Sequence, residues 1–156
     1  MSTSIPDGDA AQGAAPRIFD PLDVAASEQL IMPEGLVGFP ACHAFALVPA
    51  GLPGCSWLRS LDHTTLALLV VDPFLYFPGY SIDVPPPVMA KLQATEPADV
   101  SVQAVATLGG AHHGATANLQ APLIFNVQRR SGYQYVCPDA SWGMHEPIVP
   151  PRTTTI

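Results

Sequence analysis

Hydrophobic and polar residues alternate over several stretches of the chain with the period of two that is typical of β-strands. The clearest stretch is 100–108, VSVQAVATL, in which every second residue is apolar. Because successive side chains of a strand point to opposite faces, this pattern predicts a half-buried strand. A shorter run, 66–71, is entirely aliphatic and is closed by Asp72 and Pro73, which predicts a strand buried on both faces.

Further strand-like segments lie on both sides of these two. They are residues 18–24, 29–32, 44–48, 56–61, 123–128 and 133–137. The last two segments flank residues 129–132, RRSG, and we expect Gly132 to adopt a positive φ in a hairpin turn between them.

One segment predicts a helix. Residues 86–94, PPVMAKLQA, place helix-forming residues after a proline that suits a first helical turn. Val88, Met89 and Leu92 would form the apolar face of this helix, and residues 95–97 would end it.

Together these elements predict a mainly β fold, a small antiparallel β-barrel-like single domain with one short helix near 86–94. Proline contributes 18 of the 156 residues, which excludes a helix bundle or a coiled coil. The domain is expected over residues 17–149. Residues 1–16 are expected to form a disordered N-terminal tail and residues 150–156 a flexible C-terminal tail, because both are rich in small, polar and proline residues.

Charge narrows the range of partners. Charged residues make up 12% of the chain, the net charge is −7, and Lys91 is the single lysine. Binding to nucleic acid or to an anionic membrane needs clustered Lys and Arg, so direct contact with either is not expected. Residues 1–16 resemble no secretory signal, and the three widely spaced cysteines fit a reducing compartment, so a cytoplasmic location is expected.

No motif in the chain predicts catalysis. His112 and His113 follow two glycines, and a metal site would have to join this pair to Cys42, His43 or Cys137. No CxxC or HxxxH spacing supports such a site, and the glycines lack the ending of a phosphate-binding loop. We expect no enzyme, no metal and no cofactor, while a metal or cysteine enzyme built on these residues stays as a lesser alternative.

An aromatic cluster is the stronger candidate for function. Residues 72–80, DPFLYFPGY, hold four aromatic rings between prolines that are expected to prevent a regular helix. Some of these rings are expected to fill the core, and others to form an exposed patch for a protein partner.

Four motifs, in order and at fitting distances, resemble the FliW family of flagellar assembly factors. They are PEGLVGF at 33–39, VVDPFLYFPGY at 70–80, PADV at 97–100 and TANLQAPLIFN at 116–126. The resemblance runs from about residue 18 to residue 137. It implies a protein that binds flagellin in the cytoplasm and antagonises the translational repressor CsrA by allosteric binding, so that flagellin synthesis is coupled to export. The chain departs from the family pattern at Pro21 and at residues 142–147, where the family tends to carry an Arg before a proline, and both ends and the run 85–87 look particular to this sequence. The unusual ends and the proline run leave a FliW-like paralogue with another protein partner as the alternative.

The motif residues divide into two predicted groups. The candidates for partner contact are Glu34, Phe74, Tyr76 and Tyr80. The candidates for structural roles are Pro33, Gly35, Gly38, Phe39, Asp72, Pro73, Asn118, Pro122 and Asn126. Among the latter we expect the two glycines to adopt positive φ, Phe39 to fill the core, and the two asparagines to bond backbone groups at turns or strand ends.

Overall fold

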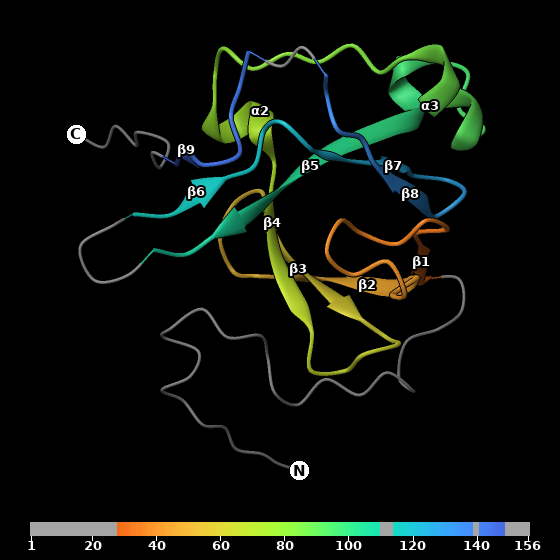
Figure 1. The fold of residues 1–156 in the computed structure, drawn as a ribbon, viewed down its shortest axis with the longest axis horizontal. Coiled ribbons are helices and arrows are strands. Elements are labelled where there is room, and N and C mark those ends of the chain that lie inside the picture. Colours follow the sequence, from red (N-terminus) through yellow and green to blue (C-terminus); the bar gives the residue numbers. More distant parts are fainter. Residues whose placement is uncertain (1–27, 110–113, 139–140, 149–156) are drawn as a thin grey trace.

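A computed structural model describes residues 28–109, 114–138 and 141–148, and strands dominate this part of the chain (Figure 1). The strands are β1 (Leu30–Ile31), β2 (Ala44–Pro49), β3 (Cys55–Ser60), β4 (Ala67–Val71), β5 (Val100–Thr107), β6 (Thr116–Ala117), β7 (Leu123–Asn126), β8 (Ser131–Gln134) and β9 (Glu146–Pro147). The α-helices are α2 (Pro73–Tyr76) and α3 (Pro86–Lys91), and a 3-10 turn, η3 (Pro97–Asp99), precedes β5.

Seven of the strands close into a barrel. They follow one another in the order β4-β3-β2-β1-β8-β7-β5, and an additional pairing of β4 with β5 closes the ring. The two-residue strands β6 and β9 extend the sheet from the end of β5. The predicted mainly β, barrel-like fold is therefore confirmed.

The barrel departs from the expected antiparallel pattern at one place. All neighbouring strands pair antiparallel except β1 and β8, which run parallel with Ile31 opposite Ser131. A parallel pair cannot be joined by a hairpin. Along the chain, β1 is the first of the seven barrel strands and β8 is the last. The pattern of single strands gives no information about such a long-range partner.

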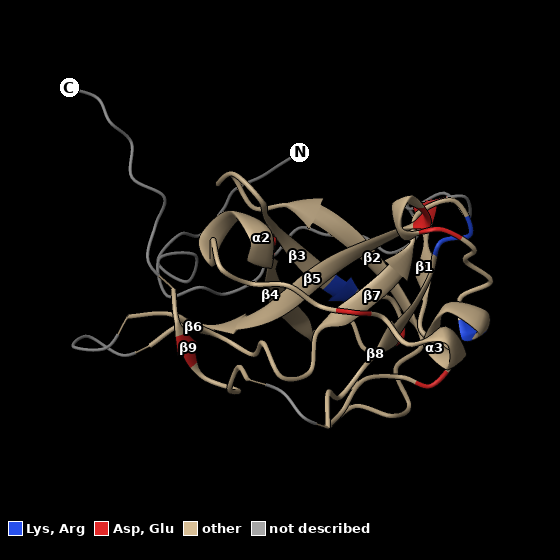
Figure 2. Ribbon diagram, turned by 90° about the horizontal axis from the view of Figure 1, so that it is seen from above, with Lys and Arg blue, Asp and Glu red and all other residues tan. Residues whose placement is uncertain are grey.

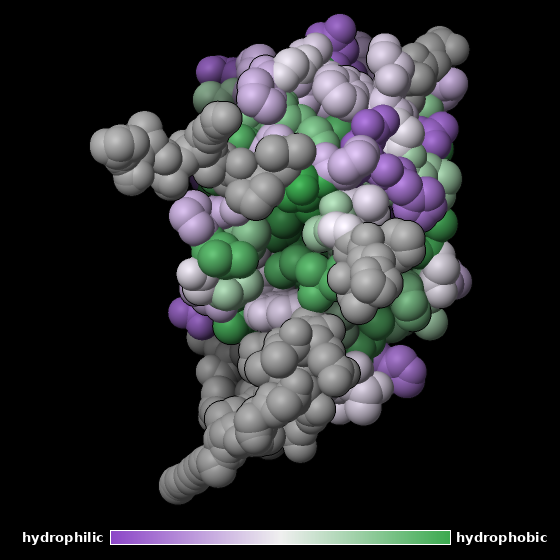
Figure 3. All heavy atoms as spheres, turned by 90° about the vertical axis from the view of Figure 1, so that its left-hand side faces the viewer, coloured by the Kyte–Doolittle hydropathy of each residue, from purple (hydrophilic) through white to green (hydrophobic). Residues whose placement is uncertain are grey.

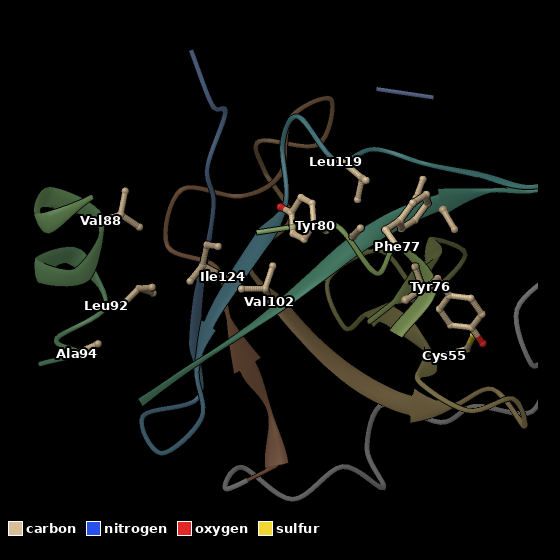
Figure 4. Close-up of a cluster of buried hydrophobic side chains, with 14 residues drawn as sticks. Cys55, Tyr76, Phe77, Tyr80, Val88, Leu92, Ala94, Val102, Leu119 and Ile124 are labelled. Carbon is tan, nitrogen blue, oxygen red and sulfur yellow. The ribbon is translucent and has the colours of Figure 1, made fainter. Parts of the chain in front are cut away.

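The hydrophobic side chains form two clusters, one on each face of β5 and β7. One cluster fills the barrel and contains Phe45, Leu58 and Phe125. The other contains Val102 and Ile124 and lies under α2, α3 and the segment that joins them (Figure 4). Consecutive residues of β7 alternate between the clusters, so this strand is buried on both faces.

The predicted helix is confirmed, and it is shorter than expected. α3 begins after Pro85 and buries Val88, and Leu92 at its end is also buried. The following residue, Gln93, has a φ of 56°, which ends the helix before residue 94.

A second helical turn was not expected. Prolines were predicted to keep residues 72–80 free of helix, yet Pro73–Tyr76 form α2. The Asp72 carboxylate caps this turn by accepting a hydrogen bond from the Phe74 N–H at 2.9 Å, and Pro73 stands at the first helical position, where no N–H is needed. Asp72 and Pro73 thus end β4 as predicted and also start a helix.

The β7–β8 hairpin corrects the prediction for Gly132. The residue with positive φ is Arg130, at 55°, while Gly132 lies inside β8. A Cβ on Gly132 would come within 2.5 Å of the Phe125 ring and 2.6 Å of the Met32 sulfur. Glycine is therefore required here for close packing, not for turn geometry.

The predicted strand 18–24 and the two predicted tails, 1–16 and 150–156, lie outside the described residues. Among the residues that are described, none of the helices has the length and apolar character needed to cross a membrane.

Candidate protein-binding surfaces

The aromatic rings of residues 72–80 divide between the core and the surface. Phe74 is 48% exposed, whereas Tyr76 and Tyr80 are 9% and 6% exposed. Tyr76 and Tyr80 were predicted as partner contacts, but the structure places both rings in the hydrophobic cluster under α2 and α3 (Figure 4). Their burial leaves almost no surface for a partner, so of the three rings only Phe74 is available for contact.

Tyr76 anchors α2 to the loop before β3. Its hydroxyl donates a hydrogen bond to the Pro53 carbonyl at 2.6 Å and lies 3.4 Å from the Cys55 sulfur. The bond to Cys55 and burial together raise the pKa of Tyr76 to about 12. The hydroxyl is thus kept protonated and serves as a structural donor.

Tyr80 holds the aromatic cluster together by ring packing. Its ring lies 5.4 Å from that of Phe74 and 5.7 Å from that of Trp142, in tilted and edge-on arrangements. Its hydroxyl is buried and has no hydrogen-bond partner among the described residues. Burial, assisted by Cys137, raises the pKa of Tyr80 to about 12.

Beside Phe74 the surface opens into a groove of about 530 Å³, which we call the Phe74 groove. It is lined by Asp72, Phe74, Ile82, Asp83, Val84, Met89, Pro97, Val100, Ser101, Val102 and Gln103. Most of these side chains are apolar. The two charged ones are both carboxylates, and no Lys or Arg is among these described lining residues.

The loop of residues 33–39 forms a second exposed surface. Gly35 and Gly38 have φ values of 69° and 92°, as predicted, and a Cβ on Gly35 would come within 2.5 Å of the Pro40 carbonyl oxygen. Leu36 and Phe39 bond each other through both backbone N–H groups, at 3.2 and 2.8 Å. The prediction that Phe39 fills the core is wrong: Leu36 is 4% exposed and Phe39 is 38% exposed, because the turn directs the leucine inward.

Glu34 ties this loop to α3. Its carboxylate lies 3.1 Å from the Lys91 ammonium, which also lies 4.2 Å from the centre of the Tyr133 ring. Both neighbours raise the pKa of Lys91, and Glu34 contributes more than Tyr133. We call the residues around this contact the Glu34 surface; it comprises the exposed Glu34, Val37, Phe39 and Val136 and the partly buried Tyr133 and Gln134. All of these except Phe39 line a hollow of about 350 Å³. Val37 and Val136 are among its large exposed apolar side chains.

The predicted structural asparagines are confirmed. The Asn118 side-chain oxygen accepts hydrogen bonds from the N–H groups of Gln120 and Ala121 at 3.1 and 3.0 Å. Asn126 ends β7 in the same manner, and its amide also donates to the Leu92 carbonyl at 2.7 Å. This last bond joins the end of α3 to the barrel.

The predicted structural prolines differ in burial. Pro73 and Pro122 are fully buried, and Pro33 is exposed at the start of the loop 33–39.

The described residues bring no metal-binding group together. No cluster of three or more His, Cys, Asp or Glu side chains occurs among them, and Cys42 and Cys55 are buried as free thiols. Burial also raises the pKa of Cys137, which keeps this thiol protonated. His112 and His113 lie outside the described residues.

The described part of the chain carries few basic residues, and one of its faces has an apolar hollow. Figure 2 shows that Lys and Arg form no continuous patch on the described part of the ribbon. Figure 3 shows hydrophobic residues gathered in a hollow on the side where α2, β6 and β9 lie, with hydrophilic residues along part of its rim. Exposed apolar areas of this kind are typical of protein interaction surfaces.

Comparison with known proteins agrees with this geometry. A family model described as FliW protein matches residues 14–148. The chain belongs to the FliW family. The FliW-family chain is 37% identical over 123 residues to the flagellar assembly factor FliW of Treponema denticola, a match that covers 78% of this chain and 84% of the relative. It is 38% identical over 120 residues to that of Moorella thermoacetica, covering 76% of each.

The fold agrees with a solved member of the FliW family. A crystal structure of the flagellar assembly factor FliW superimposes with a TM-score of 0.73 and 28% identity, and it covers 81% of this chain and 89% of the other. Both exposed surfaces described above lie within the matched residues 14–148, since these include Glu34 and Phe74.

Sequence reasoning missed most of the Phe74 groove. It found Phe74 and Asp72, but not the wall formed by Ile82 and Val84. The available signal was weak, because the alternation SIDV at residues 81–84 is too short to predict a strand.

Proposed function

We propose that this FliW-family chain is a flagellar assembly factor that binds flagellin in the cytoplasm and antagonises the translational repressor CsrA by allosteric binding. Flagellin synthesis would in this way be coupled to flagellin export. The observation that carries the proposal is the match of the FliW model to residues 14–148, together with relatives named flagellar assembly factor FliW. The role needs no catalytic group, metal or cofactor.

Two features of the molecule support protein binding. The Phe74 groove and the Glu34 surface each combine exposed apolar side chains with a carboxylate, which is a common composition of protein contacts. The net charge of −7 favours encounter with a basic partner and disfavours direct contact with RNA.

The helix α3 lies next to both surfaces. Met89 of α3 lines the Phe74 groove, and Lys91, two residues later, pairs with Glu34. A partner bound at one surface can therefore shift the other through a single short helix. This arrangement suits a protein that exchanges between two partners.

The direct test is calorimetric titration of the full chain with flagellin and with CsrA from the same host. We expect both proteins to bind, and flagellin to reduce the amount of CsrA held. The Phe74→Ala variant should weaken at least one of the two complexes about tenfold, the loss typical of a central exposed aromatic. Val127→Ala removes another exposed apolar side chain, 52% exposed in the β7–β8 turn, and serves as the matched control.

Absence of binding to both proteins would contradict the proposal. Capture of a different, reproducible protein partner by the same chain would then favour the alternative, a FliW-like paralogue with another protein partner. The run of prolines at 85–87, which looks particular to this sequence, starts α3, the helix that carries Met89 and Lys91.

A further inference from the structure

The segment between α2 and α3 crosses the barrel without pairing to it. Residues 81–84 lie in neither helix nor strand, and none of their backbone N–H or C=O groups has a hydrogen-bond partner among the described residues (Figure 1). Ile82 and Val84 are half-buried against the core, while Ser81 and Asp83 are exposed. The segment thus alternates like a strand, and the described chain does not occupy its backbone groups.

Opposite this segment, the first half of β5 also has an open edge. β4 pairs with residues 104–106 of β5 and no further, because Asp72 turns the chain into α2. The other edge of β5 is occupied by β7 along residues 100–103.

Register identifies the free backbone groups on the open edge. The Val127 N–H donates to the Asp99 carbonyl, and the Asn118 N–H donates to the Val105 carbonyl. In a strand, the backbone groups of alternate residues point to the same edge. The backbone groups of odd-numbered residues of β5 therefore point to β7 and β6, and those of Val100 and Val102 point to the open edge. The Val100 N–H is bound to Pro97. Within the described chain this leaves the Val100 carbonyl and both backbone groups of Val102 without partners.

The Phe74 groove lies between these two open backbones. Its lining includes residues 82–84 on one side and 100–103 on the other, with Phe74 and Asp72 from α2 and Met89 from α3. We propose that the groove is a docking site for an extended peptide segment of a partner protein, which adds as a short strand beside residues 100–103 of β5 and carries a Lys or Arg next to Asp83.

Charge and geometry define the peptide. Both charged lining residues, Asp72 and Asp83, are carboxylates, which favours a basic side chain in the occupant. A strand antiparallel to β5 would continue the direction of β4 and span about four residues, or about 13 Å at 3.3 Å per residue. Backbone bonds would supply affinity, and apolar side chains against Phe74 and Met89 would supply selectivity.

The proposal concerns the mode of binding and does not depend on which protein is the partner. It is tested with a phage-displayed library of random octapeptides selected on the immobilised full chain. Enriched peptides should alternate apolar residues and carry Lys or Arg. Asp83→Lys should weaken their binding about fivefold or more, since it converts attraction into repulsion at an exposed site. Glu28→Lys, the same charge change at an exposed residue that does not line the groove, should leave binding within about twofold.

Amide hydrogen exchange measured by NMR gives the decisive readout. A peptide bound as a strand should slow exchange of the Val102 N–H about tenfold or more, because the backbone bond must open before exchange occurs. Selection of no peptide, an unchanged affinity in Asp83→Lys, or amphipathic helical peptides that leave Val102 exchange unaltered would each overturn the proposal. None of these outcomes bears on flagellin or CsrA binding, which calorimetry tests separately.

Discussion

The same substitution at two neighbouring tyrosines should have different effects on stability. Tyr76→Phe removes a hydroxyl that donates to the Pro53 carbonyl at 2.6 Å and contacts the Cys55 sulfur. The carbonyl of Pro53 would then lose its donor in a partly buried position. Tyr80→Phe removes a hydroxyl that is buried and has no partner among the described residues.

The magnitudes follow from the state of each hydroxyl. Loss of a partly buried hydrogen bond costs about 0.5–1.5 kcal/mol, so Tyr76→Phe should lower the free energy of unfolding by that amount. Removal of an unpartnered buried hydroxyl relieves a desolvation cost, so Tyr80→Phe should be neutral or stabilising by about 1 kcal/mol. Tyr80→Ala, by contrast, removes the whole ring and should cost about 3–5 kcal/mol.

Urea unfolding at pH 7, followed by circular dichroism, measures all three variants against the unmodified chain. For a chain of 156 residues each kcal/mol corresponds to a shift of about 2–4 °C in Tm, so thermal melts provide a second measurement. A loss in Tyr80→Phe equal to that in Tyr76→Phe would refute the reasoning, since it would mean that the Tyr80 hydroxyl has a stabilising partner. If Tyr80→Ala left the stability unchanged, the Tyr80 ring would not be part of the core and would again be a candidate for partner contact.

Three other changes test separate parts of the fold. Gly132→Ala should destabilise the chain by about 1–3 kcal/mol in urea unfolding, because its Cβ would overlap the Phe125 ring, whereas Gly114→Ala, with open space around it, should not. The Asp62 carboxylate accepts hydrogen bonds from the backbone N–H groups of Ala44 and His43, and these bonds, the one from Ala44 most, lower the pKa of Asp62 below 3.8. Its carboxylate therefore stabilises the fold above that pH, and the advantage of the unmodified chain over Asp62→Ala should shrink as the pH falls below about 4, which unfolding at pH 7 and pH 3 measures. Asn126→Ala should cost about 1–3 kcal/mol, because the buried Leu92 carbonyl and two partly buried backbone N–H groups after β7 lose their partner. Asn126→Asp keeps the acceptor for the turn and loses the amide donor, so its unfolding separates the two contributions.

Local patterns in the sequence were sufficient for most single elements. The alternation at 100–108 predicted β5, and the proline-led segment 86–94 predicted α3 with Val88 and Leu92 buried. These predictions succeed because an element buried against one layer repeats its apolar side chains with the period of its own backbone.

Long-range contacts were not accessible in the same way. Closure of the barrel depends on pairing of β4 with β5 and of β1 with β8, and neither pair is joined by a short turn. Gly132 is explained by Phe125 and Met32, which approach it from β7 and from the end of β1. The turn-like sequence RRSG predicted a positive φ for Gly132. The close packing that requires glycine arises only when the strands come together, so the local sequence could not reveal it.

The candidate surfaces were predicted in part for the same reason. Glu34 and Phe74 are exposed as expected, but Phe39 and Tyr80 were assigned to the wrong environment. An aromatic residue in a loop motif can face either way, and the choice is decided by the turn that carries it. The backbone bonds between Leu36 and Phe39 direct the leucine inward, and α2 directs Tyr76 inward while Phe74 remains outside.

The helix α3 is where the two surfaces meet, and its attachment explains how they can affect each other. Met89 forms part of the Phe74 groove, Lys91 pairs with Glu34, and the Leu92 carbonyl accepts the Asn126 amide from the barrel. The helix has six residues and no side-chain cap at its start, so tertiary contacts hold it in place more than its own hydrogen bonds do. A peptide that pushes on Met89 would therefore move Lys91 relative to Glu34 more readily than it would deform the barrel. The bond from the Asn126 amide to the Leu92 carbonyl ties the end of this helix to β7, so Asn126→Ala removes this side-chain hydrogen bond between the barrel and that end of the helix.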